Sequence, residues 1–133
     1  MKKLIALAGA LVLCCGAPAQ AADSHEKLFK EYIAWMKDTT KVLESVKDKD
    51  SAKEATPKLK KLGDKKKELD KRGKKLGQPS QDDAKGLIKY FKELKEVGGK
   101  FQKEIARVGK VEGGKDALKA LDLKMPGKPK KEE

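Results

Sequence analysis

The feature that most constrains the fold is the stretch 81–108, where apolar residues recur at alternating spacings of three and four. The stripe consists of Ala84, Leu87, Phe91, Leu94, Gly98, Phe101, Ile105 and Val108. This spacing places all of its members on one face of an α-helix. A helix with one apolar face must bury that face, so other segments have to cover it. Because Gly98 falls in the stripe, we expect a neighbouring helix to approach closely there.

Segment 24–47 also has helical spacing, with two adjacent apolar stripes. The stripes are Leu28, Tyr32, Trp35, Val42 and Val46, and Phe29, Ile33, Met36 and Leu43. So broad an apolar face is typical of a helix covered on two sides. Asp23 and Glu26 resemble a capping box at its start.

Segment 52–76 carries a narrower ladder. Its members are Ala55, Leu59, Leu62, Leu69 and Leu76. Ser51 with Glu54 predicts its N-terminal cap, Pro57 predicts a kink or a late helix start, and Gly77 ends it. Ser80 with Asp83 predicts the cap of the next helix.

No segment shows the alternation of a β-strand. Short loops between helices of similar length favour antiparallel neighbours. We therefore expect an all-α, antiparallel up-down-up three-helix bundle over residues 22–124, with a short fourth helix at 115–123. We expect residues 125–133 to form a disordered tail.

The first 21 residues have the order of a secretory signal peptide. Lys2 and Lys3 precede a short apolar run, and Ala19-Gln20-Ala21 forms a cleavage signal. We expect an exported protein, periplasmic or secreted. Lipid attachment at Cys14 or Cys15 is a less favoured alternative, because Leu13 is a poor residue before a lipidated cysteine. Plain cleavage leaves no cysteine, and hence no disulfide or thiolate site.

One stretch of the chain resembles known proteins. Residues 42–62 read VLESVKDKDSAKEATPKLKKL, and LGQPS follows at 76–80. A K-D-x-x-S-A turn followed by A-x-P-K-L-x-x-L resembles a group of small, exported, uncharacterised bacterial helical proteins, over about residues 26–110. The resemblance implies a helical fold and no activity.

Residues 58–77 form the main candidate site, because basic residues dominate them. We take as a possible polyanion contact Lys58, Lys60, Lys61, Lys65, Lys67, Lys71, Arg72, Lys74 and Lys75. Single-strand nucleic-acid binding would need interleaved aromatic residues, and base reading would favour arginine, so nucleic acid is a poor fit. The stretch lacks the apolar face of a membrane-surface helix. Two interpretations remain: a solvated helix face, or a sequence-blind contact with an anionic polymer or an acidic protein.

Other side chains offer little chemistry. His25 is the single histidine, and it could bind Cu(II) only if cleavage after Ala22 left Asp23-Ser24-His25 at the N-terminus. We expect no other metal site, no cofactor and no catalytic residue. Trp35 and Tyr32 are expected in the core, with an apolar groove as the alternative.

Charge and export together suggest a function class. Removing Lys2 and Lys3 from the 33 basic residues leaves an excess of ten over the 21 acidic residues. We expect a non-enzymatic envelope interaction protein whose lysine-rich face contacts an anionic polymer or acidic partner. The alternative is a chaperone-like binder of unfolded exported proteins.

Overall fold

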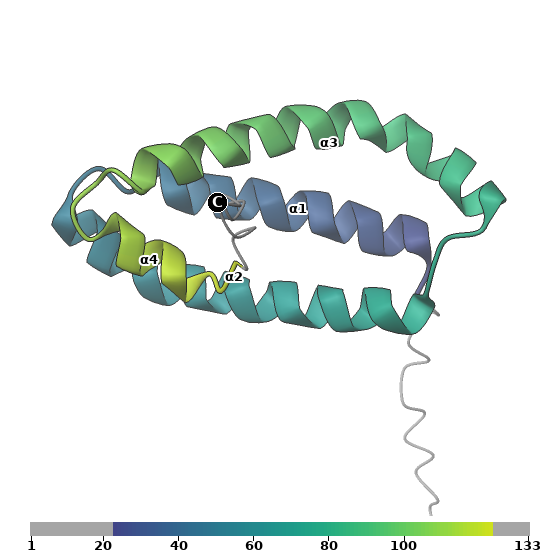
Figure 1. The fold of residues 1–133 in the computed structure, drawn as a ribbon, viewed down its shortest axis with the longest axis horizontal. Helices are drawn as coiled ribbons and strands as arrows, with labels where there is room; N and C mark the ends of the chain where they lie inside the picture. The colour runs from purple at the N-terminus through teal and green to yellow at the C-terminus, as the bar shows by residue number, and fades with distance from the viewer. Residues whose placement is uncertain (1–22, 124–133) are drawn as a thin grey trace, which may run out of the picture.

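The computed structural model describes residues 23–123, which form a helical bundle (Figure 1). Three long helices, α1 (His25–Glu44), α2 (Lys49–Leu76) and α3 (Gln81–Val108), are followed by the short α4 (Gly114–Ala120). The expected all-α architecture is confirmed. The predicted signal peptide, its two cysteines and the predicted tail lie outside the described residues.

The helix starts differ in part from the sequence prediction. Ser24 caps α1 by accepting the Lys27 N–H at 3.1 Å, so the predicted box of Asp23 and Glu26 is wrong. Both carboxylates instead bind side chains of other helices.

The start of α2 also lies earlier than predicted, at Lys49, because Asp48 and Ser51 cap each other. The Ser51 N–H donates to Asp48 Oδ1 at 2.9 Å, and the Asp48 N–H donates to Ser51 Oγ at 2.9 Å. The predicted Ser51 and Glu54 box is therefore wrong, and Pro57 lies inside the helix rather than near its start. The predicted box of Ser80 and Asp83 at the start of α3 is confirmed.

The two-sided apolar face of α1 places it between the other long helices (Figure 1). α2 and α3 each pack against α1, but no Cα of α2 comes within 8 Å of a Cα of α3. Trp35 marks the centre of the core: it is fully buried, its ring packs edge-on against Phe101, and its Nε1–H donates to the Leu62 carbonyl at 2.8 Å. Trp35 is thus a core residue, as predicted.

α4 docks on α2 through a glycine. Ala117 and Leu121 of this segment are fully buried. A Cβ on Gly63 would lie 2.8 Å from the Leu121 carbonyl oxygen, so only glycine allows this approach. The close approach expected at Gly98 is wrong, since a Cβ there would meet nothing within 4 Å.

Both arginines join α1 to its neighbours. Arg72 of α2 binds Asp23 through Nε at 2.8 Å and Nη2 at 2.6 Å, and it also binds Glu31. Arg107 of α3 donates to the Leu43 and Val46 carbonyls at 2.7 Å and so binds the chain at the end of α1.

The approach at Gly63 yields a test with a matched control. Alanine normally stabilises a helix interior by about 1 kcal/mol relative to glycine, which is the gain we expect for Gly99→Ala in open space. At Gly63 the added methyl group must displace the chain after α4. We expect Gly63→Ala to be less stable than Gly99→Ala by about 1–3 kcal/mol, the usual cost of overpacking. Urea unfolding followed by Trp35 fluorescence measures both; equal stabilisation would contradict the close contact.

The Arg72 ion pairs yield a pH-dependent test. The hydrogen bonds from Arg72 hold the pKa of both Asp23 and Glu31 below its usual range. A carboxyl whose pKa is lowered by folding stabilises the protein above its unfolded pKa of about 4, and this contribution disappears as the pH falls through the folded pKa. The stability difference between the natural protein and Arg72→Met should therefore be largest near neutral pH and shrink below about pH 4.

Urea unfolding at several pH values measures that difference. Lys71→Met is the control, because Lys71 is exposed and forms no ion pair among residues 23–123. A pH-independent difference for Arg72→Met would show that the ion pairs do not contribute as the geometry indicates.

Candidate functional site

The candidate polyanion contact lies on the solvent side of α2. All eight of its lysines are exposed. Within residues 23–123, seven form no ion pair: Lys58, Lys60, Lys61, Lys65, Lys71, Lys74 and Lys75. The eighth, Lys67, lies with its Nζ 2.8 Å from Asp122 Oδ2, which raises the pKa of the lysine. We call the seven the α2 lysine face.

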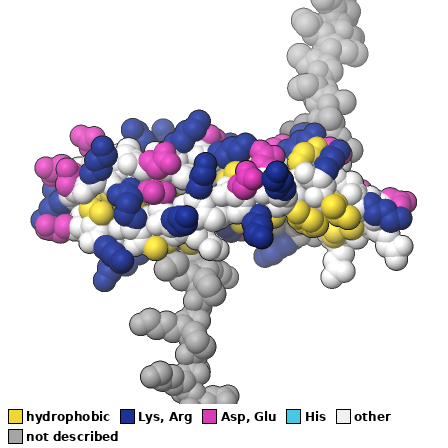
Figure 2. Space-filling view, turned by 90° about the horizontal axis from the view of Figure 1, so that it is seen from above, with side chains coloured by type: hydrophobic (Ala, Val, Ile, Leu, Met, Phe, Trp, Pro, Cys, Tyr) yellow, Lys and Arg dark blue, Asp and Glu magenta, His cyan; other side chains and the backbone are white. Residues whose placement is uncertain are grey.

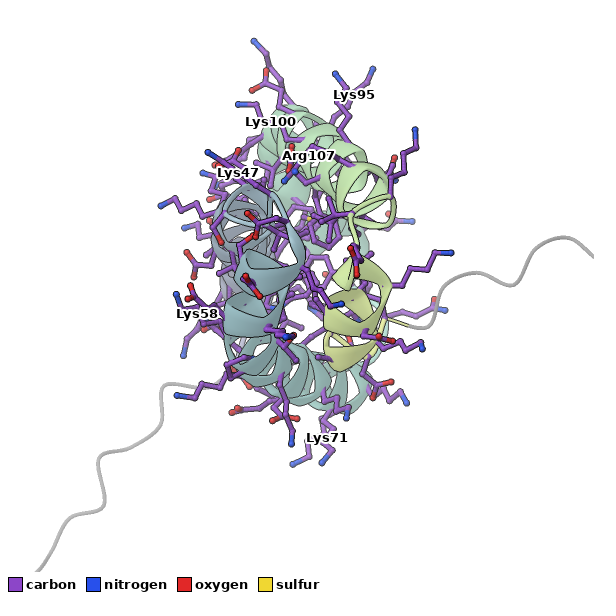
Figure 3. All side chains as sticks on the ribbon, turned by 90° about the vertical axis from the view of Figure 1, so that its left-hand side faces the viewer. Lys47, Lys58, Lys71, Lys95, Lys100 and Arg107 are labelled. Carbon is purple, nitrogen blue, oxygen red and sulfur yellow. The ribbon has the colours of Figure 1, made fainter. Side chains whose placement is uncertain are left out.

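The α2 lysine face is spread around the helix and does not converge on one point. Lys58 and Lys71 extend from different sides of α2 (Figure 3). Asp64 and Glu68 lie among the lysines on the same exposed surface. Such an arrangement suits a diffuse contact with a flexible polyanion, because a small anion would need converging donors.

Arg72 has a different role from the lysines with which the sequence grouped it. Its side chain is 22% exposed and is held by Asp23 and Glu31 of α1. These two carboxylates also raise the pKa of the guanidinium. Arg72 therefore stabilises the helix pair and is not free to bind a polymer.

An apolar groove runs along α1 in two hollows of about 960 and 950 Å³. Tyr32 of α1 and Leu123 line both hollows. The first lies beyond the end of α4 and is lined by Leu28, Leu69 and Leu87 among others. The second lies between α3 and α4. It is lined by Met36, Gly98, Phe101, Ile105 and Leu118 among others.

Hydrophobic side chains continue from the groove onto the surface of α3. Ile88 is 60% exposed and Phe91 is 51% exposed. Figure 2 shows hydrophobic side chains gathered toward one end of the molecule, while lysines and carboxylates alternate over the rest of that face. Exposed apolar surface next to a groove is a common mark of a binding site.

Cations predominate at the rim of the groove. His25, Lys66, Lys67 and Lys74 line the first hollow together with Asp70 and Asp122. The second hollow is lined by three cationic side chains and no acidic one: Lys110, Lys115 and Lys119. The groove therefore combines an apolar floor with a positive edge.

Every carboxyl group in the described chain whose pKa is shifted has a pKa below its usual value. The Tyr90 hydroxyl donates to Glu26 Oε1 at 2.6 Å, and Lys30 and Lys89 add ion pairs at 3.1 Å. Together they lower the pKa of Glu26 to about 2. A general acid needs a pKa near the working pH. Asp48 and Asp83 instead accept hydrogen bonds at helix starts, and Asp23, Glu26 and Glu31 are held as charges in ion pairs.

His25 joins the start of α1 to the α2–α3 connection. Its Nε2 lies 3.2 Å from the Gly77 carbonyl, and its Nδ1 lies 3.3 Å from Asp83 Oδ2. Cu(II) binding at Asp23-Ser24-His25 would require the ring to leave these contacts and would disturb the Ser24 cap. Within residues 23–123, no three His, Cys, Asp or Glu side chains cluster as metal ligands.

The groove is the part of the site that the sequence showed least clearly. The sequence predicts Tyr32 in the core, with an apolar groove as the alternative, and the structure shows it half-buried at the groove floor. The usable signal was the length of α3's apolar stripe, which exceeds what one neighbouring helix can cover. Only Leu87 and Val108 of this helix are buried.

No helix within the described range is both long and apolar enough to cross a membrane.

No protein-family model, curated protein or solved structure matches the chain.

Proposed function

We propose that this protein is a non-enzymatic, exported interaction protein that contacts an anionic envelope polymer through the α2 lysine face. The observation that carries the proposal is the set of seven exposed lysines on one helix that form no ion pair with any residue from 23 to 123. Most other charged contacts on the bundle pair a lysine with an acid, as Lys37 does with Glu93 and Lys49 with Glu112. An unpaired cationic surface keeps its full attraction for an external anion.

The binding mechanism follows from the chemistry of lysine. Each ammonium group is a mobile point charge on a flexible stem, and it contacts phosphate or carboxylate without a fixed geometry. Binding a polyanion releases its condensed counterions, so affinity depends steeply on salt. Lipopolysaccharide and teichoic acid-like polymers have the required chemistry.

The proposal predicts a salt-dependent affinity that is localised to α2. A variant with Lys58, Lys61, Lys65 and Lys71 changed to Gln should bind lipopolysaccharide more weakly and with a shallower dependence of log affinity on log salt. The matched control changes four lysines of α3 that are also exposed and outside the ion pairs of the described chain: Lys92, Lys95, Lys100 and Lys103. It removes the same charge from another surface and should keep most of the affinity.

Titration at low and moderate salt distinguishes the outcomes. Equal losses in the two variants would show that net charge acts without a site. Absence of binding to lipopolysaccharide and teichoic acid at low salt would refute the polyanion proposal.

A second candidate function, chaperone-like binding of unfolded exported proteins, is favoured by the exposed Ile88 and Phe91. A chaperone holds apolar segments of its clients on such a surface. We expect the natural protein to suppress aggregation of a reduced, unfolding client, and Ile88→Ser with Phe91→Ser to lose this effect. Light scattering measures the aggregation of the client. If the double variant still suppressed it, the chaperone-like function would be eliminated. Both side chains are more than half exposed, so the substitutions should cost little stability.

A further inference from the structure

The groove along α1 occupies the part of a fourth-helix position that α4 leaves open. Four-helix bundles place each long helix against two neighbours around a common core. Here α1 has two long neighbours, whereas α2 and α3 each have α1 as their one long neighbour. α2 and α3 remain apart along their length (Figure 1). A fourth long helix between α2 and α3 would close the bundle.

α4 demonstrates that this position accepts a helix. It packs against both α2 and α3, and its Ala117 and the Leu121 that follows it are fully buried. α4 and the turn that follows it lie along α2 from Ala52, which is close to Gly113, to Lys67, whose Nζ lies 2.8 Å from Asp122 Oδ2. Along α3 the lining of the two hollows runs from Leu87 to Gly109, about 33 Å, which matches a helix of about 20 residues.

The lining defines one face of such a helix. The floor is apolar and aromatic, with Leu28 and Tyr32 in the first hollow and Met36 in the second. Phe101 and Ile105 form the α3 wall, and Gly98 leaves space beside them. A helix with an apolar stripe at i, i+3, i+4 and i+7 fits a groove of this kind.

The rim defines the charge of the occupant. Lys74 lines the first hollow, and Lys110 and Lys115 line the second, without ion pairs in the described chain. Acidic side chains flanking an apolar stripe would meet these lysines. A second copy of this chain would bring the same excess of positive charge, so like charges oppose self-association through this face.

We infer that the groove binds an acidic amphipathic helix of a partner protein, with the helix's apolar stripe on Tyr32 and Phe101 and its carboxylates on the rim lysines. The groove shares only Lys74 with the α2 lysine face, and the inference does not rest on polymer binding. A fatty acid or anionic lipid shares the combination of apolar chain and negative charge, and it enters the experiment as a competing occupant.

The test uses designed peptides of about 20 residues as probes. One has a leucine stripe with flanking glutamates, the second has the same stripe with lysines, and the third has the acidic composition in scrambled order. We expect only the first to bind and to gain helicity, as measured by anisotropy of the labelled peptide and by circular dichroism.

Two glycine variants locate the binding site. Gly98→Leu places a side chain in the groove, and because a Cβ there meets no atom within 4 Å the protein should stay folded. Gly99→Leu adds the same side chain on the adjacent exposed position, where a Cβ likewise meets nothing. We expect Gly98→Leu to weaken the acidic peptide at least about tenfold and Gly99→Leu to leave its affinity within about twofold.

Charge reversal separates this inference from the proposed function. Lys110→Glu with Lys115→Glu should weaken binding of the acidic peptide and leave lipopolysaccharide binding unchanged. Lys65→Glu should weaken lipopolysaccharide binding and leave binding of the acidic peptide unchanged. The inference is overturned if the acidic peptide does not bind, if the basic peptide binds equally well, or if Gly98→Leu has no effect. It is also overturned if palmitate or anionic phospholipid vesicles bind, if Gly98→Leu abolishes that binding, and if the peptide does not bind.

Discussion

The whole arrangement depends on α1 burying apolar side chains on two sides at once. Trp35 at its centre packs against Phe101 of α3 and donates to the Leu62 carbonyl of α2, so one side chain joins all three long helices. Because α1 stands between them, no Cα of α2 comes within 8 Å of a Cα of α3. The same constraint that builds the core therefore leaves a groove, and α4 is too short to fill it.

Much of the fold follows from local patterns in the sequence. The three-four spacing of α3, the double stripe of α1 and the leucine ladder of α2 define which residues face inward, and Gly77 and Ser80 define a helix stop and a start. These features depend on neighbours a few residues away, so one sequence suffices. The start of α2 was harder, since Asp48 and Ser51 form a cap as plausible by spacing as Ser51 and Glu54, and only the geometry chooses between them.

The candidate site was less predictable, because it depends on which helices meet. Arg72 reads as one more cation in a basic run, yet Asp23 and Glu31 from a distant part of the chain hold it inside the bundle. Gly98 reads as a point of close approach, yet the tight contact is at Gly63. Both errors share a cause: spacing within a helix gives a face, whereas the partner of that face is a property of the tertiary structure. With both arginines used in helix contacts, the cations left for solvent are all lysines.

The position of α1 also has a consequence for the order in which the chain is made. α1 precedes the other described helices in the chain, yet its contacts are complete only when α3 has been made: the Leu62 carbonyl lies 27 residues beyond Trp35, and Arg107 lies 61 residues beyond Val46. When the chain is made from its N-terminus, the two apolar sides of α1 are not both covered until α3 is nearly complete. The bundle therefore cannot complete its packing until most of the sequence is available. A chain that is still being synthesised remains unfolded until its final third has been made.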